Sequence, residues 1–271
     1  MVPQRVGNKP MNMKNSNLYY EVHGNQGPFL LMVHGLMSSR VQWMPNLEFL
    51  KSFCRPVIIE LLGHGRSPSP SDPESYSPAH YVAEFEVIRE ALNARKWFVC
   101  GQSLGASLTL RYGLMHPERI LAQIFTNSRS AFSETSSEER TTGLVNLLKK
   151  EGRQALERLP VHPAKSRHLS PSIKKALIED IKLLDLQGFC NTLQFLSPKS
   201  SVKNIIHGNT VPTLMVAGKF DKAFLPLGEF ARQNMPRLEA VVLDGGHAVN
   251  IDAAHEFNKA LKAFIEKNRE E

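Results

Sequence analysis

The sequence predicts an α/β fold in which a mostly parallel sheet is flanked by helices and interrupted by a helical insertion. Short runs that are apolar on both faces, as the central strands of a parallel sheet are, alternate with segments whose apolar residues recur every three or four positions. The alternation stops near residue 128, and polar, helix-like sequence continues to about residue 208 before strand-like runs return. Strands separated by helix-length segments are typical of parallel sheets with crossover helices.

The strands and helices of the core are predicted from where the apolar runs begin and end. Glycine, proline and polar residues punctuate the runs, and Ser77 followed by Pro78 predicts a capped start of a helix. A short alternating segment at residues 17–22 precedes the continuous apolar runs. We expect the further strands at residues 29–33, 57–59, 96–100, 120–125, 213–217 and 240–243, and helices at 77–92, 106–116 and 253–267.

The insertion sets the expected domain boundaries. Residues 14–127 and 209–271 form the predicted core, and residues 128–208 form a helical cap. Inside the cap, we expect helices at residues 141–150, 154–158, 172–186 and 188–196.

Composition and charge exclude several classes of protein. Hydrophobic residues make up 42% of the 271 residues and charged residues 22%, which is ordinary for a globular protein. The formal net charge of +7 comes from scattered Lys and Arg residues rather than one patch, so nucleic acid is not an expected partner. Three widely spaced cysteines without a CxxC pair predict neither a disulfide framework nor a zinc site. No apolar run approaches the roughly 20 residues of a membrane span, and the N-terminus shows no secretory signal, so we expect a cytoplasmic protein.

The segment Gly101-Gln102-Ser103-Leu104-Gly105 carries the predicted chemistry. It follows one predicted strand directly and precedes one predicted helix directly, and in that context G-x-S-x-G forms a sharp turn that exposes the serine hydroxyl. We therefore predict Ser103 as a nucleophile.

A serine nucleophile needs a base, and the base needs a carboxylate. His247 lies on a loop just after the strand at residues 240–243, where it can face the same end of the sheet as Ser103. Asp221 follows the strand at 213–217, so we predict it as the acid, in the order Ser, Asp, His. Asp244 and Asp252 stay as alternative acids.

Two backbone N–H groups are predicted to bind the negative oxygen of a tetrahedral intermediate. One belongs to Leu104, the residue after the nucleophile, and the other to Leu36, in the loop after the strand at residues 29–33. His34 in the same loop is either a brace for the loop, which we favour, or a second base.

Together these residues resemble the α/β-hydrolase superfamily. The matching landmarks are Val33-His34-Gly35, the run from Leu62 to Ser67, the elbow at Ser103, Gly218-x-x-Asp221 and Gly246-His247. Two departures are visible. Glu60-Leu61 stands where the family commonly has an Asp, and Gly105-Ala106 replaces a frequent glycine pair.

The resemblance implies an eight-stranded, mostly parallel sheet and an enzyme that needs no cofactor and no metal. It also implies hydrolysis of a carboxylic ester of a small molecule through an acyl group on Ser103. Thioester hydrolysis, carbon–carbon bond hydrolysis and an elimination like that of the menaquinone-pathway synthase are alternatives on the same triad. A noncatalytic ligand-binding member is an alternative of another class. Epoxide hydrolases and haloalkane dehalogenases are disfavoured, because they resemble this fold but use Asp at the nucleophile position.

The substrate pocket is the least readable part of the sequence. Each candidate residue has a second, structural interpretation: the aromatic residues as core packing, and the arginine as an ion-pair partner. The candidates are Trp43, Arg129, Phe132, Phe189 and Phe195.

Overall fold

The computed structural model describes residues 16–133, 138–166 and 169–269. Within them lies one sheet of seven strands in the order β1-β3-β2-β4-β5-β6-β7. β1 runs antiparallel to β3, and all the other neighbours are parallel. The strands are β1 (Tyr20–Val22), β2 (Phe29–Val33), β3 (Arg55–Ile59), β4 (Trp97–Gln102), β5 (Ile120–Thr126), β6 (Thr213–Gly218) and β7 (Leu238–Leu243).

The α/β prediction is therefore confirmed, with one correction to the number of strands. The described residues contain seven strands where eight were expected. Each predicted core strand is present, most of them longer by one or two residues than the apolar run that predicted it.

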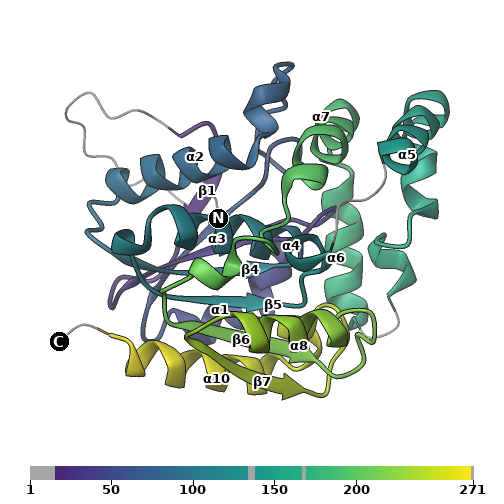
Figure 1. The fold of residues 1–271 in the computed structure, drawn as a ribbon. Coiled ribbons are helices and arrows are strands. Elements are labelled where there is room, and N and C mark those ends of the chain that lie inside the picture. The colour runs from purple at the N-terminus through teal and green to yellow at the C-terminus, as the bar shows by residue number, and fades with distance from the viewer. Residues whose placement is uncertain (1–15, 134–137, 167–168, 270–271) are drawn as a thin grey trace.

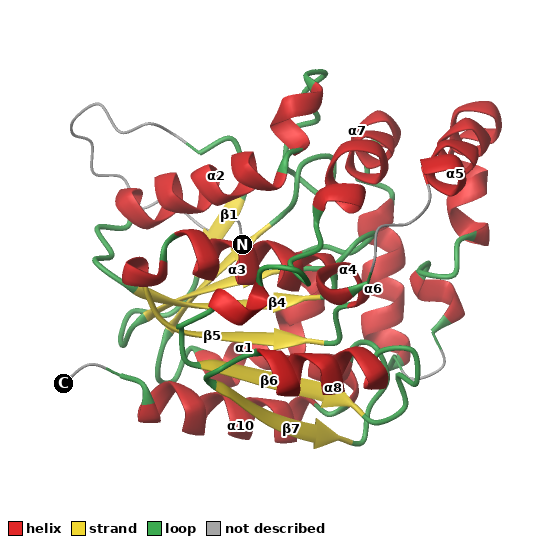
Figure 2. Ribbon diagram, in the orientation of Figure 1, coloured by secondary structure: helices red, strands yellow, loops and turns green. Residues whose placement is uncertain are grey.

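Helices cover both faces of the sheet, as Figures 1 and 2 show. Side chains of β2 alternate between the two faces. Leu31 and Val33 pack in one cluster with α2 (Pro78–Ala91) and α3 (Leu104–Met115), whereas Leu30 and Met32 pack in another with α1 (Met44–Leu50) and α10 (Ala254–Lys267). α8 (Leu225–Asn234) adds to the first face through a third cluster that it shares with α3. Both faces of the central strands are thus buried, which explains their continuous apolar sequence.

In its described part, the chain between β5 and β6 forms helices, helical turns and loops and contains no strand. Its helices are α4 (Arg129–Phe132), α5 (Glu138–Glu151), α6 (Pro171–Ile181) and α7 (Leu186–Asn191), joined by short helical turns at Gly152–Arg158, Pro163–Lys165, Thr192–Leu196, Ser197–Lys199 and Ile206–Gly208. In Figure 1, α5, α6 and α7 lie together at the end of the sheet toward which the strand arrows point.

The helix expected at residues 172–186 is wrong in its C-terminal part. α6 ends at Ile181, and Asp185 begins a new helix, because its carboxylate accepts the N–H of Gly188 at 2.7 Å. The N–H of Asp185 in turn donates to Gly63 O at 2.9 Å, which ties this turn to the loop after β3. A residue that caps one helix and bonds to a distant loop cannot be recognised from local spacing.

In the described part of the chain, no helix combines the length and the apolar character that a membrane span requires.

Candidate active site

Ser103 lies on the sharp turn between β4 and α3. Its backbone has φ 52° and ψ −115°, a strained conformation for a residue with a side chain. The glycines on either side leave room for this turn. A Cβ on Gly105 would lie 2.2 Å from the carbonyl oxygen of Val33, and one on Gly101 would lie 2.5 Å from that of Gly105. Side chains at these two positions would push the turn away from the sheet.

His247 and Asp221 meet at the carboxyl ends of β6 and β7. Nδ1 of His247 donates to Oδ2 of Asp221 at 2.7 Å, which leaves Nε2 of the neutral ring as the basic nitrogen. The two alternative acids bond elsewhere. Asp244 is exposed and pairs with Lys219 at 3.0 Å, and Asp252 accepts the backbone N–H of Gly246 at 2.8 Å.

Asn127, directly after β5, holds the Asp221 loop and was not singled out by the sequence. Its Nδ2 donates to Oδ2 of Asp221 at 3.1 Å and to the carbonyl of Gly246 at 2.9 Å, while its Oδ1 accepts the N–H of Gly218 at 2.8 Å. A polar residue at the end of a buried strand is the signal that could have identified it.

The environment of Asp221 keeps it ionised. Burial by itself raises the pKa of this carboxyl, but the hydrogen bond and charge of His247 lower it, and the N–H groups of Asn127 and Phe224 lower it further. The pKa of Asp221 therefore lies below its ordinary value. An ionised carboxylate on Nδ1 fixes the ring tautomer and stabilises a protonated imidazole.

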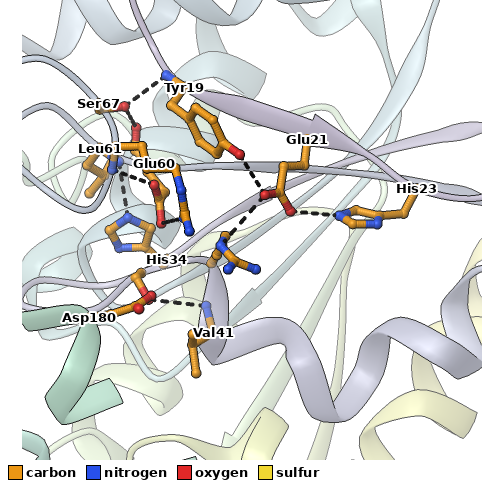
Figure 3. Close-up of polar contacts among 12 residues, drawn as sticks. Tyr19, Glu21, His23, His34, Val41, Glu60, Leu61, Ser67 and Asp180 are labelled. Atoms are coloured by element: carbon orange, nitrogen blue, oxygen red, sulfur yellow. Dashed lines mark hydrogen bonds and ion pairs between the residues drawn. The ribbon is translucent and has the colours of Figure 1, made fainter. Parts of the chain in front are cut away.

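His34 fixes the loop that carries Leu36. Its buried ring donates from Nδ1 to the carbonyl of Gly35 at 2.7 Å and accepts the N–H of Leu61 on Nε2 at 3.0 Å, the second contact being drawn in Figure 3. In a trans peptide the C=O and N–H point in opposite directions. Because the Gly35 carbonyl is bonded to His34, the N–H of Leu36 points away from that ring. This position makes His34 a brace, as the sequence favoured, and not a base.

His64 braces the next residue of the same loop. It accepts the N–H of Met37 on Nε2 at 3.2 Å and donates from Nδ1 to the carbonyl of Leu62 at 3.0 Å. Burial lowers the pKa of His34 to about 3, with the nearby His64 adding to the effect, and burial lowers the pKa of His64 to about 4. Both rings are therefore neutral near pH 7 and hold fixed tautomers.

Two glutamines connect the loops further. Oε1 of Gln42 accepts the N–H of Gly35 at 3.2 Å, and its backbone carbonyl accepts from Nδ2 of Asn250 at 3.0 Å. Gln102, next to Ser103, donates from Nε2 to the carbonyl of His247 at 3.2 Å. The loops of Leu36, Ser103 and His247 are thus linked by side-chain amides.

Glu60, one of the two departures from the family pattern, is fully buried beside this region (Figure 3). Its Oε2 accepts the backbone N–H of Arg66 at 2.6 Å, and its carboxyl fills the space where a Cβ of Gly65 would lie, 2.3 Å away. Burial raises the pKa of Glu60, while the N–H and the charge of Arg66 lower it. The carboxylate thus organises the turn after β3, although it is one methylene longer than an aspartate.

A cavity of about 900 Å³ opens beside Ser103. Ser103, Leu104, Leu36, Asp221 and His247 all lie on its wall. The chain between β5 and β6 supplies much of the rest of the wall, and the described residues that line it from this segment include Arg129, Ser130, Ser133, Leu144, Pro160, Val161, His162, Lys165, Leu169, Leu177, Leu193, Ser197 and Ser201.

Of the five candidate pocket residues, only Arg129 lines this cavity. Trp43 and Phe132 are fully buried in core clusters on opposite faces of the sheet. Phe189 is fully buried against the ring of His64, with centroids 6.0 Å apart, and Phe195 packs on the cluster around α2. These four aromatic side chains therefore pack against other side chains of the core instead of lining the cavity, as large apolar residues commonly do.

The described residues contain no group of three or more His, Cys, Asp or Glu side chains placed to hold a metal ion.

Comparisons with known proteins agree with the α/β architecture of the chain. A family described as "alpha/beta hydrolase fold" matches residues 28–154. A putative 2-succinyl-6-hydroxy-2,4-cyclohexadiene-1-carboxylate synthase of Bacillus subtilis is 23% identical over 253 residues, which is 89% of this chain and 91% of that protein. The 3-oxoadipate enol-lactonase 1 of Acinetobacter baylyi is 23% identical over 262 residues, or 94% of this chain and 95% of that protein.

A solved structure shares the fold. The enol-lactonase from Burkholderia xenovorans LB400 superposes with a TM-score of 0.77 at 21% identity and covers 92% of this chain and 96% of its own. The family match, the full-length relatives and the shared architecture lead to one conclusion: this chain is an enzyme with the α/β-hydrolase fold.

Proposed function

We propose that the protein is a serine hydrolase that cleaves a carboxylic ester of a small molecule, with Ser103 as nucleophile, His247 as base and Asp221 as acid. One observation carries the proposal. Ser103, on a strained turn, shares a cavity with a histidine whose other ring nitrogen is bonded to a carboxylate at 2.7 Å. A serine, a base and an acid that orients the base are the parts that nucleophilic acyl transfer requires.

In the proposed reaction, Oγ of Ser103 attacks the ester carbonyl and its proton passes to Nε2 of His247. The negative oxygen that forms accepts the N–H groups of Leu36 and Leu104. The intermediate collapses, His247 gives its proton to the leaving alcohol, and the acyl group stays on Ser103. Water, deprotonated by His247, then releases the acid and restores the serine.

The N-terminus of α3 supports the role of Leu104. As the first residue of that helix, Leu104 has an N–H without an intrahelical acceptor, and the helix dipole favours negative charge there. The orientation that His34 gives to the Gly35–Leu36 peptide supports the role of the second donor.

We further propose that residues 128–208 act as a cap that selects the substrate, on a core of residues 14–127 and 209–271. The wall residues that this segment contributes support the assignment. It is attached to the core through polar contacts: Oγ of Ser39 donates to Asp180 at 2.7 Å, and Oγ of Ser69 donates to Asp185 at 2.7 Å.

Active-site labelling tests the proposal. We expect a fluorophosphonate probe to label the protein, and p-nitrophenyl esters of graded chain length to be hydrolysed. Ser103→Ala should abolish both signals, while Ser38→Ala, a serine on the same cavity wall, should retain them. A folded wild-type protein that neither labels nor turns over any ester contradicts the proposal and favours a noncatalytic ligand-binding role.

The alternative reactions use the same residues and differ in the substrate. The same panel should therefore include thioesters and a diketone whose carbon–carbon bond can be hydrolysed. It should also include a substrate for an elimination like that of the menaquinone-pathway synthase, because the Bacillus subtilis relative is named as a synthase. A higher kcat/KM for one of these than for every ester would replace ester hydrolysis as the activity, and would leave the roles of Ser103 and His247 unchanged.

A further inference from the structure

Arg129 is held close to the nucleophile by its neighbour. Oγ of Ser128 donates to the backbone carbonyl of Ser103 at 2.6 Å and accepts the N–H of Ala131 at 3.1 Å, so this one side chain both anchors and caps α4. Arg129 is the first residue of α4 and lies on the wall of the cavity that holds Ser103. The backbone of Arg129 is thus fixed next to Ser128, whose side chain bonds directly to the turn that carries Ser103.

The guanidinium of Arg129 has no partner in the part of the chain that the structure describes. The side chain is exposed, and it makes no hydrogen bond or ion pair with a described residue, unlike two arginines nearby. Arg111 donates to the carbonyls of Lys199 and Ser201, and Arg153 donates to two carbonyls at the end of α6 and beyond it. The alternative role as a structural ion-pair partner therefore has no support among the described residues.

The charged side chains on the described cavity wall are equal in number, but both acids are already engaged by described residues, whereas Arg129 is not. The cationic side chains of the wall are Arg129 and Lys165, and its acidic side chains are Asp221 and Asp252. Both acids are engaged within the core, Asp221 with His247 and Asp252 with the N–H of Gly246. The wall residues next to Arg129 in the sequence and in the cap are neutral hydroxyls, namely Ser130, Ser133, Ser197 and Ser201.

Apolar side chains on the same wall describe the rest of the substrate. Leu36, Met37, Leu144 and Leu193 belong to one apolar cluster or pack against it, and all four line the cavity. A substrate that fits has an ester carbonyl at Ser103, a short apolar body and one anionic end.

We infer that the substrate is a monoester or lactone of a dicarboxylic acid, whose free carboxylate is bound by Arg129. This inference rests on the proposed ester hydrolysis. Guanidinium is suited to the role, because its planar N–H groups bind a carboxylate through two parallel charge-assisted hydrogen bonds. Arg129 is then a specificity-determining residue that takes no part in the bond-breaking steps.

Matched substrates test the inference. Mono-p-nitrophenyl esters of succinate, glutarate, adipate and pimelate are compared with neutral p-nitrophenyl esters of the same chain length. We expect wild type to prefer the anionic ester at one or more chain lengths. Arg129→Met should lower kcat/KM for that ester by about 10- to 100-fold, the range expected for hydrogen bonds to a charged group, and should change the neutral ester by less than about twofold. The kcat/KM of Arg129→Lys for the anionic ester should fall between the values for wild type and for Arg129→Met.

The control is Arg232→Met, which removes an exposed arginine on α8, away from the cavity. It should leave the preference as in wild type. Equal losses on anionic and neutral esters in Arg129→Met, or no preference in wild type, overturn the inference while ester hydrolysis itself stands.

A binding measurement separates this inference from the proposed function. Adipate and glutarate are titrated calorimetrically into Ser103→Ala, which cannot react, and into the double variant that also carries Arg129→Met. Binding that depends on Arg129 supports the anion site even if no ester is turned over. Absence of binding of both adipate and glutarate at millimolar concentration contradicts it, whatever the labelling of Ser103 shows.

Discussion

The side-chain amide of Asn127 donates to the same carboxylate oxygen of Asp221 that accepts the ring N–H of His247. One oxygen thus receives two donors, from the end of β5 and from the loop after β7. Asn127 also bonds to the backbone on both sides of this contact, at Gly218 and Gly246. The proposed acid and base are therefore held by a residue that follows β5, a strand that contributes neither of them.

Asn127→Ala should reduce activity without removing any group of the proposed triad. We expect kcat to fall by about 10- to 100-fold, because a loose acid loop misplaces the base, and KM to change little. Steady-state kinetics on the best ester checks this, with Asn234→Ala on α8 as the control. An unchanged kcat in a folded Asn127→Ala protein would show that the loop holds its position without the amide.

The choice among the three candidate acids can be tested by removing one charge at a time. Asp221→Asn should lower kcat by about 10³- to 10⁴-fold, since the ring loses the partner that sets its tautomer. Asp244→Asn should be close to wild type, because Asp244 is exposed and bonded only to the exposed side chain of Lys219 among the described residues. Each variant replaces one carboxylate oxygen with an amide nitrogen, so comparing the two variants controls for the effect of the substitution itself. A large loss in Asp244→Asn with Asp221→Asn active would reassign the acid.

The two buried histidines should make stability depend on pH in a specific window. The pKa of His34 is about 3 and that of His64 about 4 in the folded protein, against about 6.5 for an unfolded histidine. Below pH 6.5 the unfolded chain binds protons that the folded chain does not bind. The free energy of unfolding should therefore be highest above pH 6.5 and fall as the pH decreases toward the folded values, by up to about 1.4 kcal/mol per pH unit for each ring.

Urea denaturation at pH 5.0, 5.5, 6.0, 6.5 and 8.0 measures this slope above the ordinary pKa values of carboxyl groups. His34→Gln keeps a side chain that can donate and accept hydrogen bonds. It should reduce the pH dependence of the free energy of unfolding by the contribution of about one bound proton. An identical slope in wild type and His34→Gln would mean that His34 does not titrate differently in the two states. Activity should fall as well, because the loop that carries Leu36 loses its brace.

Two glycine substitutions should have opposite effects on stability. Gly105→Ala places a Cβ within 2.2 Å of the Val33 carbonyl, so we expect a loss of about 1–3 kcal/mol together with loss of labelling at Ser103. Gly143→Ala lies inside α5, where a Cβ meets nothing within 4 Å, and should stabilise the protein by about 0.5–1 kcal/mol. Thermal denaturation of the two variants beside wild type decides the point. A destabilised Gly143→Ala with a tolerated Gly105→Ala would contradict the packing described for both.

Much of the fold could be predicted because buried parallel strands have a local signature. The apolar runs at β2, β4 and β6 and the helix cap at Ser77 are readable without knowledge of the neighbours. The break between α6 and α7 was not readable, because the turn between them is held by a bond from Asp185 to Gly63, more than a hundred residues away. The pocket aromatics failed for a similar reason: an apolar side chain looks the same in sequence whether it faces a cavity or the core.

The sequence by itself determined the chemical groups and their order: a serine on a strand-to-helix turn, an acid and a histidine at later strand ends, and an insertion between them. Parallel strands bring their carboxyl ends to one edge, so these positions follow from topology alone. Only the tertiary structure decided which carboxylate faces His247, that His34 is a brace, that Asn127 ties the loops together, and that Arg129 faces the cavity without a described partner. Those properties depend on side-chain directions and distances between segments far apart in the chain, and hydrogen bonds and desolvation act over a few ångströms of space, which linear spacing does not encode.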